Sequence, residues 1–534
     1  MDSFGTEIKL VLPMLITAGG AFLILLLRAI TNKALPYSLV ALATLLAAMA
    51  TLFHNQAFYE ASSLIWSGSI SIDPLMFWVQ FGLLAASAIN VFLMSGSLKS
   101  AGVESIAEFY SLVLMCLFGA LLFVSAGSLL TLFLGLETMS IAAYPLCGAA
   151  LGSRRSAESA LKYFILGSFS SGFLLFGMAL IYGASGSLTL IDIANSSSYE
   201  LLALGIGLSL VGFLFKVGAV PLHFWLPDVY QGAPTVVTSF MGSVIKISSL
   251  VAFLKFAIYA GCFDLYGSVW PDILWLVSLL TVVLGNLAAV RQDNVKRMLA
   301  YSSIANIGFM LMGLLGGNAE NGPSFITMIV DSQEAYSVNG ASAILFYLLV
   351  YSRVSIGAFA ILTVVGGDEV SDKQAFNLSK FKGLGKNRPV LALVLSFFLL
   401  GLAGLPPGIA GLVAKFNMFV VAIKLEYIGL PIVAALMSAV AAYYYLRVIV
   451  YMYFYSSEEE RAKVECEAAC APWSTRLVIG TCFALLLVLG LFPNATLERA
   501  SIVVKAFMEQ QLLARTPYAA LNLIEDVDGT GADS

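Results

Sequence analysis

The sequence predicts an all-α, polytopic membrane protein with about fourteen transmembrane helices. Of its 534 residues, 60% are hydrophobic and 11% are charged, and the mean hydropathy is +0.91. These values lie far outside the range of a soluble domain of this size. Apolar runs of about 20 residues, each long enough to cross a hydrocarbon layer roughly 30 Å thick, recur along the chain and leave no separate soluble domain.

Hydropathy windows place the spans in order along the chain. They lie near residues 8–28, 36–54, 73–95, 107–126, 128–150, 161–184, 200–230, 233–259, 272–290, 297–316, 341–366, 388–424, 428–455 and 474–493. The first run lacks a basic n-region and a small-residue cleavage site. We therefore expect a retained span and not a removed signal peptide.

Lys and Arg gather in the loops that follow odd-numbered spans. Examples are Arg28, Lys99, Arg154, Arg297 and Lys386. By the positive-inside rule, these loops face the cytoplasm and both termini face the outside. The net charge of −4 is spread over short loops and an acidic tail, which argues against a nucleic-acid partner.

Two spans are too long to be single straight helices. A continuous helix from Arg388 to Lys424 would be roughly 55 Å long, but "GLAGLPPGIAG" interrupts it. The seventh span, which contains "FLFKVGAVPLHFWLPD", breaks in the same way around Pro221. Irregular backbone at membrane depth survives only beside protein or a water-lined cavity. Two broken helices five spans apart therefore predict a repeated unit with an internal polar path.

Four ionisable residues lie well inside their spans: Glu137, Lys216, Lys246 and Lys415. A charge at the bilayer centre costs at least about 2.5 to 3.5 kcal/mol, so such residues typically mark an ion or proton pathway. Lysine suits proton transfer because burial and a nearby carboxylate move its proton affinity in opposite directions. The alternative is a structural one, in which Glu137 and one lysine form a buried ion pair that fastens two helices.

Three further residues are secondary candidates. His223 beside the first break could relay protons or could bond unpaired backbone groups there. Lys162, near a span end, is expected to extend its amine to the cytoplasmic interface. Arg353, inside the eleventh span, cannot titrate usefully and is expected to hold water or a carboxylate.

The six cysteines are expected to be structural. Cys116, Cys147, Cys262 and Cys482 lie in or beside apolar runs. Cys466 and Cys470 have a four-residue spacing unlike common zinc or iron–sulfur patterns.

Several motifs occur in an order that resembles a known family. "FKVGAVPLHFWLPDVYQGAPTVVTSFM" is followed by Lys246, "VKRMLAYSSIANIGFMLMGL" and "LAGLPPGIAGLVAKFNMF". These motifs closely resemble the antiporter-like subunits of NADH-quinone oxidoreductase, respiratory complex I, and "PDVYQGAP" resembles the subunit N branch of that family. The resemblance covers most of the chain.

The resemblance implies a fold of fourteen helices with two inverted five-helix repeats, each containing a broken helix. The implied divisions are an N-terminal three-helix segment at 1–106, repeats at 107–260 and 261–456, and a final part at 457–534 with a cytoplasmic loop, the last span and a polar tail. The implied proton-translocating residues are Glu137, Lys216, Lys246 and Lys415.

The resemblance also implies an enzyme subunit in a bacterial inner membrane, beside neighbouring antiporter-like and small membrane subunits and lipid. It implies no cofactor or metal in this chain, with FMN, iron–sulfur clusters and quinone in other subunits. Asn306 stands where the family often has a histidine, the 317–340 segment is longer than usual, and Arg353 replaces a residue that is normally uncharged.

Three other readings are open at this point. The chain could be a subunit of a cation/proton antiporter, against which "PDVYQGAP" argues, or of a membrane-bound hydrogenase or related ferredoxin-linked complex. It could also be a structural spacer, in which case neutralising Lys246 would leave activity intact.

Overall fold

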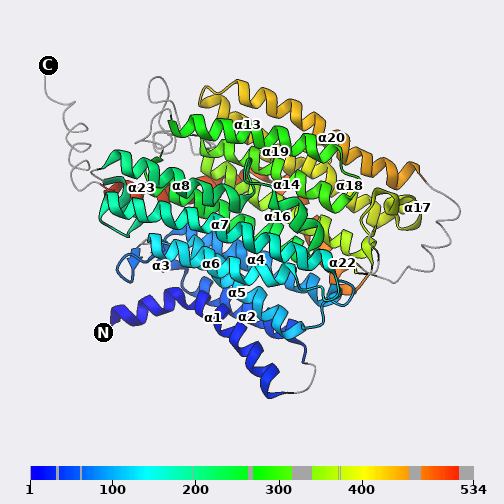
Figure 1. Ribbon diagram of the computed structural model, residues 1–534, viewed down its shortest axis with the longest axis horizontal. Coiled ribbons are helices and arrows are strands. Elements are labelled where there is room, and N and C mark those ends of the chain that lie inside the picture. Colours follow the sequence, from blue (N-terminus) through cyan, green and yellow to red (C-terminus); the bar gives the residue numbers. More distant parts are fainter. Residues whose placement is uncertain are drawn as a thin grey trace.

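The computed structural model describes residues 2–31, 35–60, 63–195, 198–262, 269–315, 339–367, 369–370, 372, 374–455 and 471–515. Within these ranges it is a bundle of long helices that lie side by side (Figure 1). A short antiparallel hairpin, β1 (Ser63–Ile65) and β2 (Ile70–Ile72), which the sequence analysis did not predict, joins α3 (Gln56–Glu60) to α4.

The first half of the bundle contains α1 (Asp2–Ile30), α2 (Tyr37–His54), α4 (Pro74–Ser97), α5 (Ile106–Val124), α6 (Leu129–Cys147), α7 (Arg154–Ser185), η1 (Leu190–Asn195), α8 (Tyr199–Val217), α9 (Trp225–Gly232), α10 (Thr235–Phe240), η2 (Met241–Ile245) and α11 (Lys246–Tyr259). The second half contains α13 (Val269–Val290), α14 (Val295–Leu311), η3 (Met312–Leu314), α16 (Gly340–Gly366), η4 (Leu378–Phe381), α17 (Leu384–Asn387), α18 (Pro389–Ala403), α19 (Ile409–Lys424), α20 (Gly429–Phe454), α22 (Trp473–Leu491) and α23 (Pro493–Arg515).

The helix count confirms the predicted polytopic all-α class. Within the described residues, twelve helical segments are long and apolar enough to cross a membrane. The shorter α14 and the broken pair α18–α19 account for the two remaining predicted spans. Large apolar side chains such as Phe22, Leu39 and Phe169 are exposed, as expected for surfaces that contact lipid.

Both predicted helix breaks are present. The first separates α8 from α9 after Gly218, whose φ of +80° is a left-handed conformation that glycine adopts easily. The second separates α18 from α19 after Gly404, with φ +76°. Side chains bond the freed backbone at the first break: the indole of Trp225 donates to the Phe215 carbonyl at 3.0 Å, and the Val220 N–H donates to the Thr281 hydroxyl at 3.0 Å. These bonds explain how a broken helix is tolerated inside the bundle.

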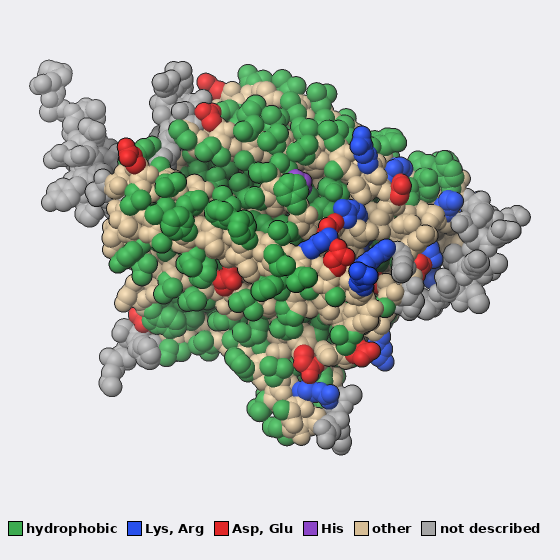
Figure 2. Space-filling view, viewed as in Figure 1, with side chains coloured by type: hydrophobic (Ala, Val, Ile, Leu, Met, Phe, Trp, Pro, Cys, Tyr) green, Lys and Arg blue, Asp and Glu red, His purple; other side chains and the backbone are tan. Residues whose placement is uncertain are grey.

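The loops predicted to be cytoplasmic meet at one end of the bundle. The Glu369 N–H donates to the Ser100 carbonyl at 3.2 Å, and the Val295 N–H donates to the Phe376 carbonyl at 2.8 Å. These bonds join the loops after α4, α13 and α16. Most Lys and Arg side chains visible in Figure 2 lie toward this end, on the right of the view, which is called the basic end below.

The central element is the helix formed by α10, η2 and α11. Every residue from Thr235 to Tyr259 is buried, so this helix is surrounded by other helices and not by lipid. Its middle turn, η2, is a π-helical turn that the sequence analysis did not predict. Such turns often occur at functional sites, and this one ends directly before Lys246.

Two other elements differ from the sequence prediction. Helix α7 begins at Arg154, well before the predicted start at 161, because the Ser153 hydroxyl accepts a hydrogen bond from the Ser156 N–H and caps it. The segment after Pro493, predicted as a polar tail, forms α23 through Arg515. Val504, Phe507 and Met508 are buried, so α23 packs on the bundle through an apolar stripe. The stripe is too narrow to raise the average hydropathy of the segment, which is why the sequence predicted a polar tail.

Candidate functional site

Lys216 lines one small pocket between α6, α7 and α8, and Glu137 bonds Ser171, another residue of that lining. The pocket lining includes Ser140, Ser171 and Lys216. Lys216 is 4% exposed, and its amine donates to the Ser140 hydroxyl at 2.7 Å and to the Tyr163 hydroxyl at 3.0 Å. Glu137 accepts a hydrogen bond from the Ser171 hydroxyl. In the described part of the chain, no ion pair within 4.0 Å joins Glu137 to a lysine. The alternative in which Glu137 and a lysine form a buried ion pair that fastens two helices therefore lacks that pair in this structure.

Lys246 lies at the centre of the buried helix, directly after the π turn. It is 2% exposed, and its amine donates to the carbonyl and to the hydroxyl of Ser303 on α14. The Tyr351 ring on α16 lies 5.4 Å from the amine, and its hydroxyl donates to Ser303 at 2.8 Å. Two neutral hydroxyl groups and a ring face therefore surround this amine, which allows it to gain or lose a proton without breaking an ion pair.

Polar side chains continue from Lys246 along α14. Asn306 donates to the Ser302 carbonyl at 2.8 Å and accepts from the Tyr347 hydroxyl at 2.8 Å. Ser302 also bonds the Tyr445 hydroxyl on α20. Asn306, which stands where the family often has a histidine, is thus held by hydrogen bonds to Ser302 and Tyr347.

Lys415 lies beside the second helix break. It is 5% exposed, its amine donates to the Ala403 carbonyl at 2.9 Å, and the Phe309 ring centroid lies 4.8 Å away. The lysine itself bonds a carbonyl freed where α18 ends. Because Phe309 follows Asn306 by one helical turn on α14, the polar groups around Lys246 reach toward Lys415.

The secondary candidates have different surroundings. Lys162 is part-exposed and forms ion pairs with Glu158 at 2.7 Å and Asp228 at 2.8 Å, close to the interfacial position that was predicted. Arg297 joins the same Asp228 at 2.7 Å. The Nδ1 atom of His223 is buried without a hydrogen-bond partner in the described residues, while the imidazole also interacts with the Pro221 backbone at the break, so both expectations for His223 stay predictions.

Arg353 has no carboxylate partner among the described residues. It is 8% exposed, and its guanidinium donates to the Ser352 hydroxyl at 3.0 Å. The expectation that it holds a carboxylate is therefore not met in that part of the chain. The longer segment at 317–340 lies almost entirely outside the described residues.

Two buried ion pairs were missed by the sequence analysis. Lys255 and Asp73 are both about 2% exposed and 3.0 Å apart, near the end of α11 opposite the basic end. Lys296 and Glu369 lie 3.6 Å apart at the basic end. Their positions close to predicted span ends concealed them, because a charge there ordinarily reaches interfacial water.

The loop beside this second pair carries an exposed ion pair. Lys380 lies 2.8 Å from Asp372. Hydrogen bonds from Lys380 and from the Gln374 backbone hold the pKa of Asp372 below its usual range. Asp372 is therefore a carboxylate at neutral pH.

The histidine, cysteine and acidic side chains are spread through the bundle. Within the described residues, no group of three or more His, Cys, Asp or Glu side chains could hold a metal ion. Cys116, Cys147, Cys262 and Cys482 are buried and form no disulfide within the described residues, and Cys466 and Cys470 lie outside them.

Comparisons with known proteins agree with this architecture. A family model described as NADH:quinone oxidoreductase/Mrp antiporter, transmembrane, matches residues 126–440. A relative from Trichlorobacter lovleyi named NADH-quinone oxidoreductase subunit N is 40% identical over 71% of this chain and 74% of its own length. A relative from Streptomyces griseus named NADH-quinone oxidoreductase subunit N 3 is 36% identical over 93% of both chains.

A solved structure gives the same result. A chain of respiratory complex I from Thermus thermophilus with bound aureothin superposes with a TM-score of 0.72 at 32% identity, over 91% of this chain and 98% of that one. The chain therefore belongs to the NADH:quinone oxidoreductase/Mrp antiporter family of transmembrane proteins, in the branch whose relatives are named NADH-quinone oxidoreductase subunit N.

Proposed function

We propose that this chain is the N subunit of a bacterial complex I and that it translocates protons through Glu137, Lys216, Lys246 and Lys415. The observation that carries the proposal is the row of three buried lysines, each held by hydroxyl groups, carbonyls or ring faces and none by a carboxylate within 4.0 Å in the described residues. A purely structural charge would be paired.

The partners of each lysine support a stepwise transfer. Lys216 shares a pocket with the Ser171 hydroxyl that bonds Glu137, so a proton can move between the carboxylate side and the amine side through hydroxyl groups or water. Lys246 and Lys415 are linked by the Ser303, Asn306 and Phe309 face of α14. Lys162 and His223 are secondary: Lys162 lies at the basic end of the same helix as Tyr163, and the unbonded Nδ1 of His223 can accept a proton.

The orientation of the chain, its division into repeats and its partners are part of the same proposal. The basic end faces the cytoplasm and both termini face the outside, in a bacterial inner membrane. Segments 107–260 and 261–456 act as two inverted repeats that meet at the helix of Lys246. The redox groups (FMN, iron–sulfur clusters and quinone) belong to other subunits, and neighbouring antiporter-like and small membrane subunits contact this chain.

The decisive test is Lys246→Ala in the assembled complex, reconstituted into vesicles. NADH–quinone electron transfer and proton uptake are recorded together, with Lys424→Ala at an exposed position as the matched control. We expect both rates to fall in Lys246→Ala while assembly survives, and the control to match wild type. Wild-type rates in Lys246→Ala, or purification of the chain without flavin and iron–sulfur subunits, would contradict the proposal.

A further inference from the structure

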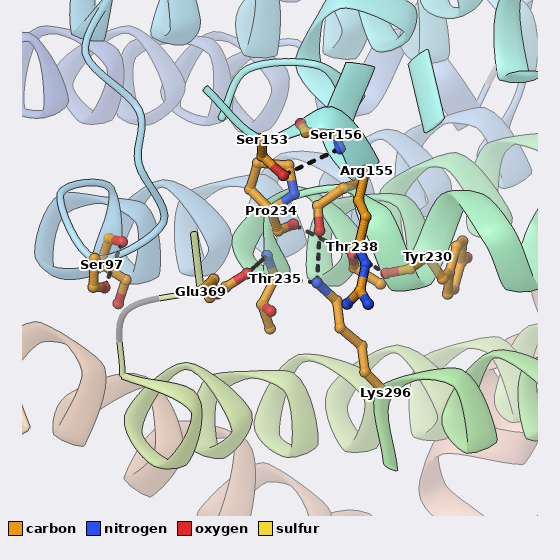
Figure 3. Close-up of polar contacts among 12 residues, drawn as sticks. Ser97, Ser153, Arg155, Ser156, Tyr230, Pro234, Thr235, Thr238, Lys296 and Glu369 are labelled. Carbon is orange, nitrogen blue, oxygen red and sulfur yellow. Dashed lines mark hydrogen bonds and ion pairs between the residues drawn. The ribbon is translucent and has the colours of Figure 1, made fainter. Parts of the chain in front are cut away.

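The buried pair of Lys296 and Glu369 lies at the basic end, where the bundle meets the loops. Lys296 is 1% exposed and the Glu369 side chain is 9% exposed. The Lys296 amine also donates to the Ala233 carbonyl at 2.6 Å, and Glu369 accepts from the Thr235 N–H at 3.0 Å (Figure 3). Both charges are therefore fixed to the start of α10, the helix that leads to Lys246.

Glu369 is the part of this pair that water can reach. It lines a pocket whose other walls include the part-exposed or exposed residues Arg155, Gln231, Asn294 and Asp372. Lys296 is not part of the pocket lining, so within the pair only Glu369 faces the pocket.

Two buried hydroxyl groups lie inward of the pair. Thr235 Oγ1 has no hydrogen-bond partner in the described residues, and the Ser355 hydroxyl interacts with that of Tyr351, whose ring faces Lys246. Buried polar groups are ordinarily bonded, so Thr235 Oγ1 is suited to hold internal water. Ser355 Oγ would lie 2.8 Å from a Cβ at Gly242, and the Tyr230 hydroxyl 3.8 Å from it, so the glycine leaves space beside both groups.

Polar groups occur on three helices between the basic end and Lys246. Thr235 and Gly242 are spaced i and i+7 on one helix, and the π turn Met241–Ile245 continues from Gly242 to Lys246, about 16 Å from Thr235 along the helix. Lys296 and Ser303 are likewise spaced i and i+7 on α14, and Ser303 accepts the hydrogen bonds of Lys246. Hydroxyl groups from α10, α14 and α16 are therefore available between the pair and Lys246.

A fastening role for the pair explains less of this arrangement. A pair that only fastens helices needs neither an exposed edge on Glu369 nor the unbonded hydroxyl of Thr235 beside it. Its ions would also be expected at hydrogen-bond distance, whereas the Lys296 amine and the Glu369 carboxylate lie 3.6 Å apart.

We propose that Glu369, held in place by Lys296, is the proton intake site that supplies Lys246, an inference that rests on the proposed function. A proton from pocket water binds the Glu369 carboxylate. It leaves through water held by the Thr235 and Ser355 hydroxyls and binds the neutral amine of Lys246. Glu369 returns to a carboxylate, so each cycle moves one proton and changes no other bond.

The test separates proton transfer from charge alone. Glu369→Cys in the assembled complex is treated with 2-carboxyethyl methanethiosulfonate, which restores a carboxylate, or with 2-sulfonatoethyl methanethiosulfonate, which restores a charge that does not take up protons near neutral pH. We expect Glu369→Cys to lose at least about tenfold in proton translocation, as for loss of a general acid–base group. We expect recovery with the carboxylate reagent only. Equal recovery with both reagents, or wild-type rates without any, would overturn the proposal.

Controls keep each outcome interpretable. Glu104→Gln changes an exposed carboxylate that is not part of the pocket lining and is expected to match wild type. Wild-type complex treated with both reagents reports reaction at native cysteines. If Glu369→Cys does not assemble, the double variant Thr235→Val with Ser355→Ala tests the proposal instead. Slowed proton translocation would support a proton route through these hydroxyl groups, and wild-type rates would overturn it. Lys246→Ala, measured in parallel, separates the two hypotheses, because its failure to affect transport contradicts the proposed function itself.

Discussion

Replacing Tyr163 by phenylalanine tests whether neutral hydroxyl partners control the charge of Lys216. The Tyr163 hydroxyl accepts one of the two hydrogen bonds from this amine, at 3.0 Å. The phenylalanine ring would keep the stacking on Trp225, with centroids 4.6 Å apart, and the ring face 5.1 Å from the amine. The substitution therefore removes one hydrogen bond and little packing.

The magnitude follows from the charge on the donor. A hydrogen bond to a charged group contributes about 1.5 to 3 kcal/mol. Its loss destabilises the protonated amine, which corresponds to a roughly 10- to 150-fold change in the proton-binding equilibrium at about 1.4 kcal/mol per factor of ten. We expect proton translocation to slow severalfold or more while assembly stays normal.

The assay uses complex in vesicles, with initial rates of NADH–quinone electron transfer and of pH-dependent dye quenching. Tyr443→Phe removes a hydroxyl from an exposed side chain and serves as the control. Ser140→Ala removes the other partner of Lys216 and is expected to slow transport as well. Wild-type rates in both Tyr163→Phe and Ser140→Ala would refute the reasoning, because the amine would then be indifferent to its bonded partners.

Two further changes test packing and burial. In Gly411→Ala, the new Cβ would clash with the Gly401 carbonyl oxygen, which should destabilise the second break by at least about 1 to 3 kcal/mol and lower the melting temperature. Gly480→Ala, with nothing within 4 Å of the new Cβ, should leave the melting temperature unchanged. In Lys255→Met, the Asp73 carboxylate stays buried without its ion pair, at a cost of about 3 to 5 kcal/mol, so less of this subunit should be recovered in purified complex. Adding Asp73→Asn should restore part of that recovery. Equal recovery of the single and double variants would contradict a desolvation cost.

Several features of this protein could be predicted from the sequence because they depend on local composition. Membrane spans follow from the length of apolar runs, and the two breaks follow from glycine and proline inside runs that are too long for one helix. The four ionisable residues inside spans could be recognised because a charge in the middle of an apolar run is costly and is therefore seldom found there without a function.

The tertiary structure decided which groups surround those charges. The Ser303 and Tyr351 partners of Lys246 come from helices more than fifty residues away, and hydropathy carries no information on helix neighbours. The burial of the Lys296 and Glu369 pair could not be predicted for the same reason. A charge near a span end is expected to be exposed, and only the contacts between distant loops bury it. The sequence by itself determined that charges enter the membrane, because that depends on residues near each other in the chain. Only the packing of distant helices determined what each charge can exchange a proton with.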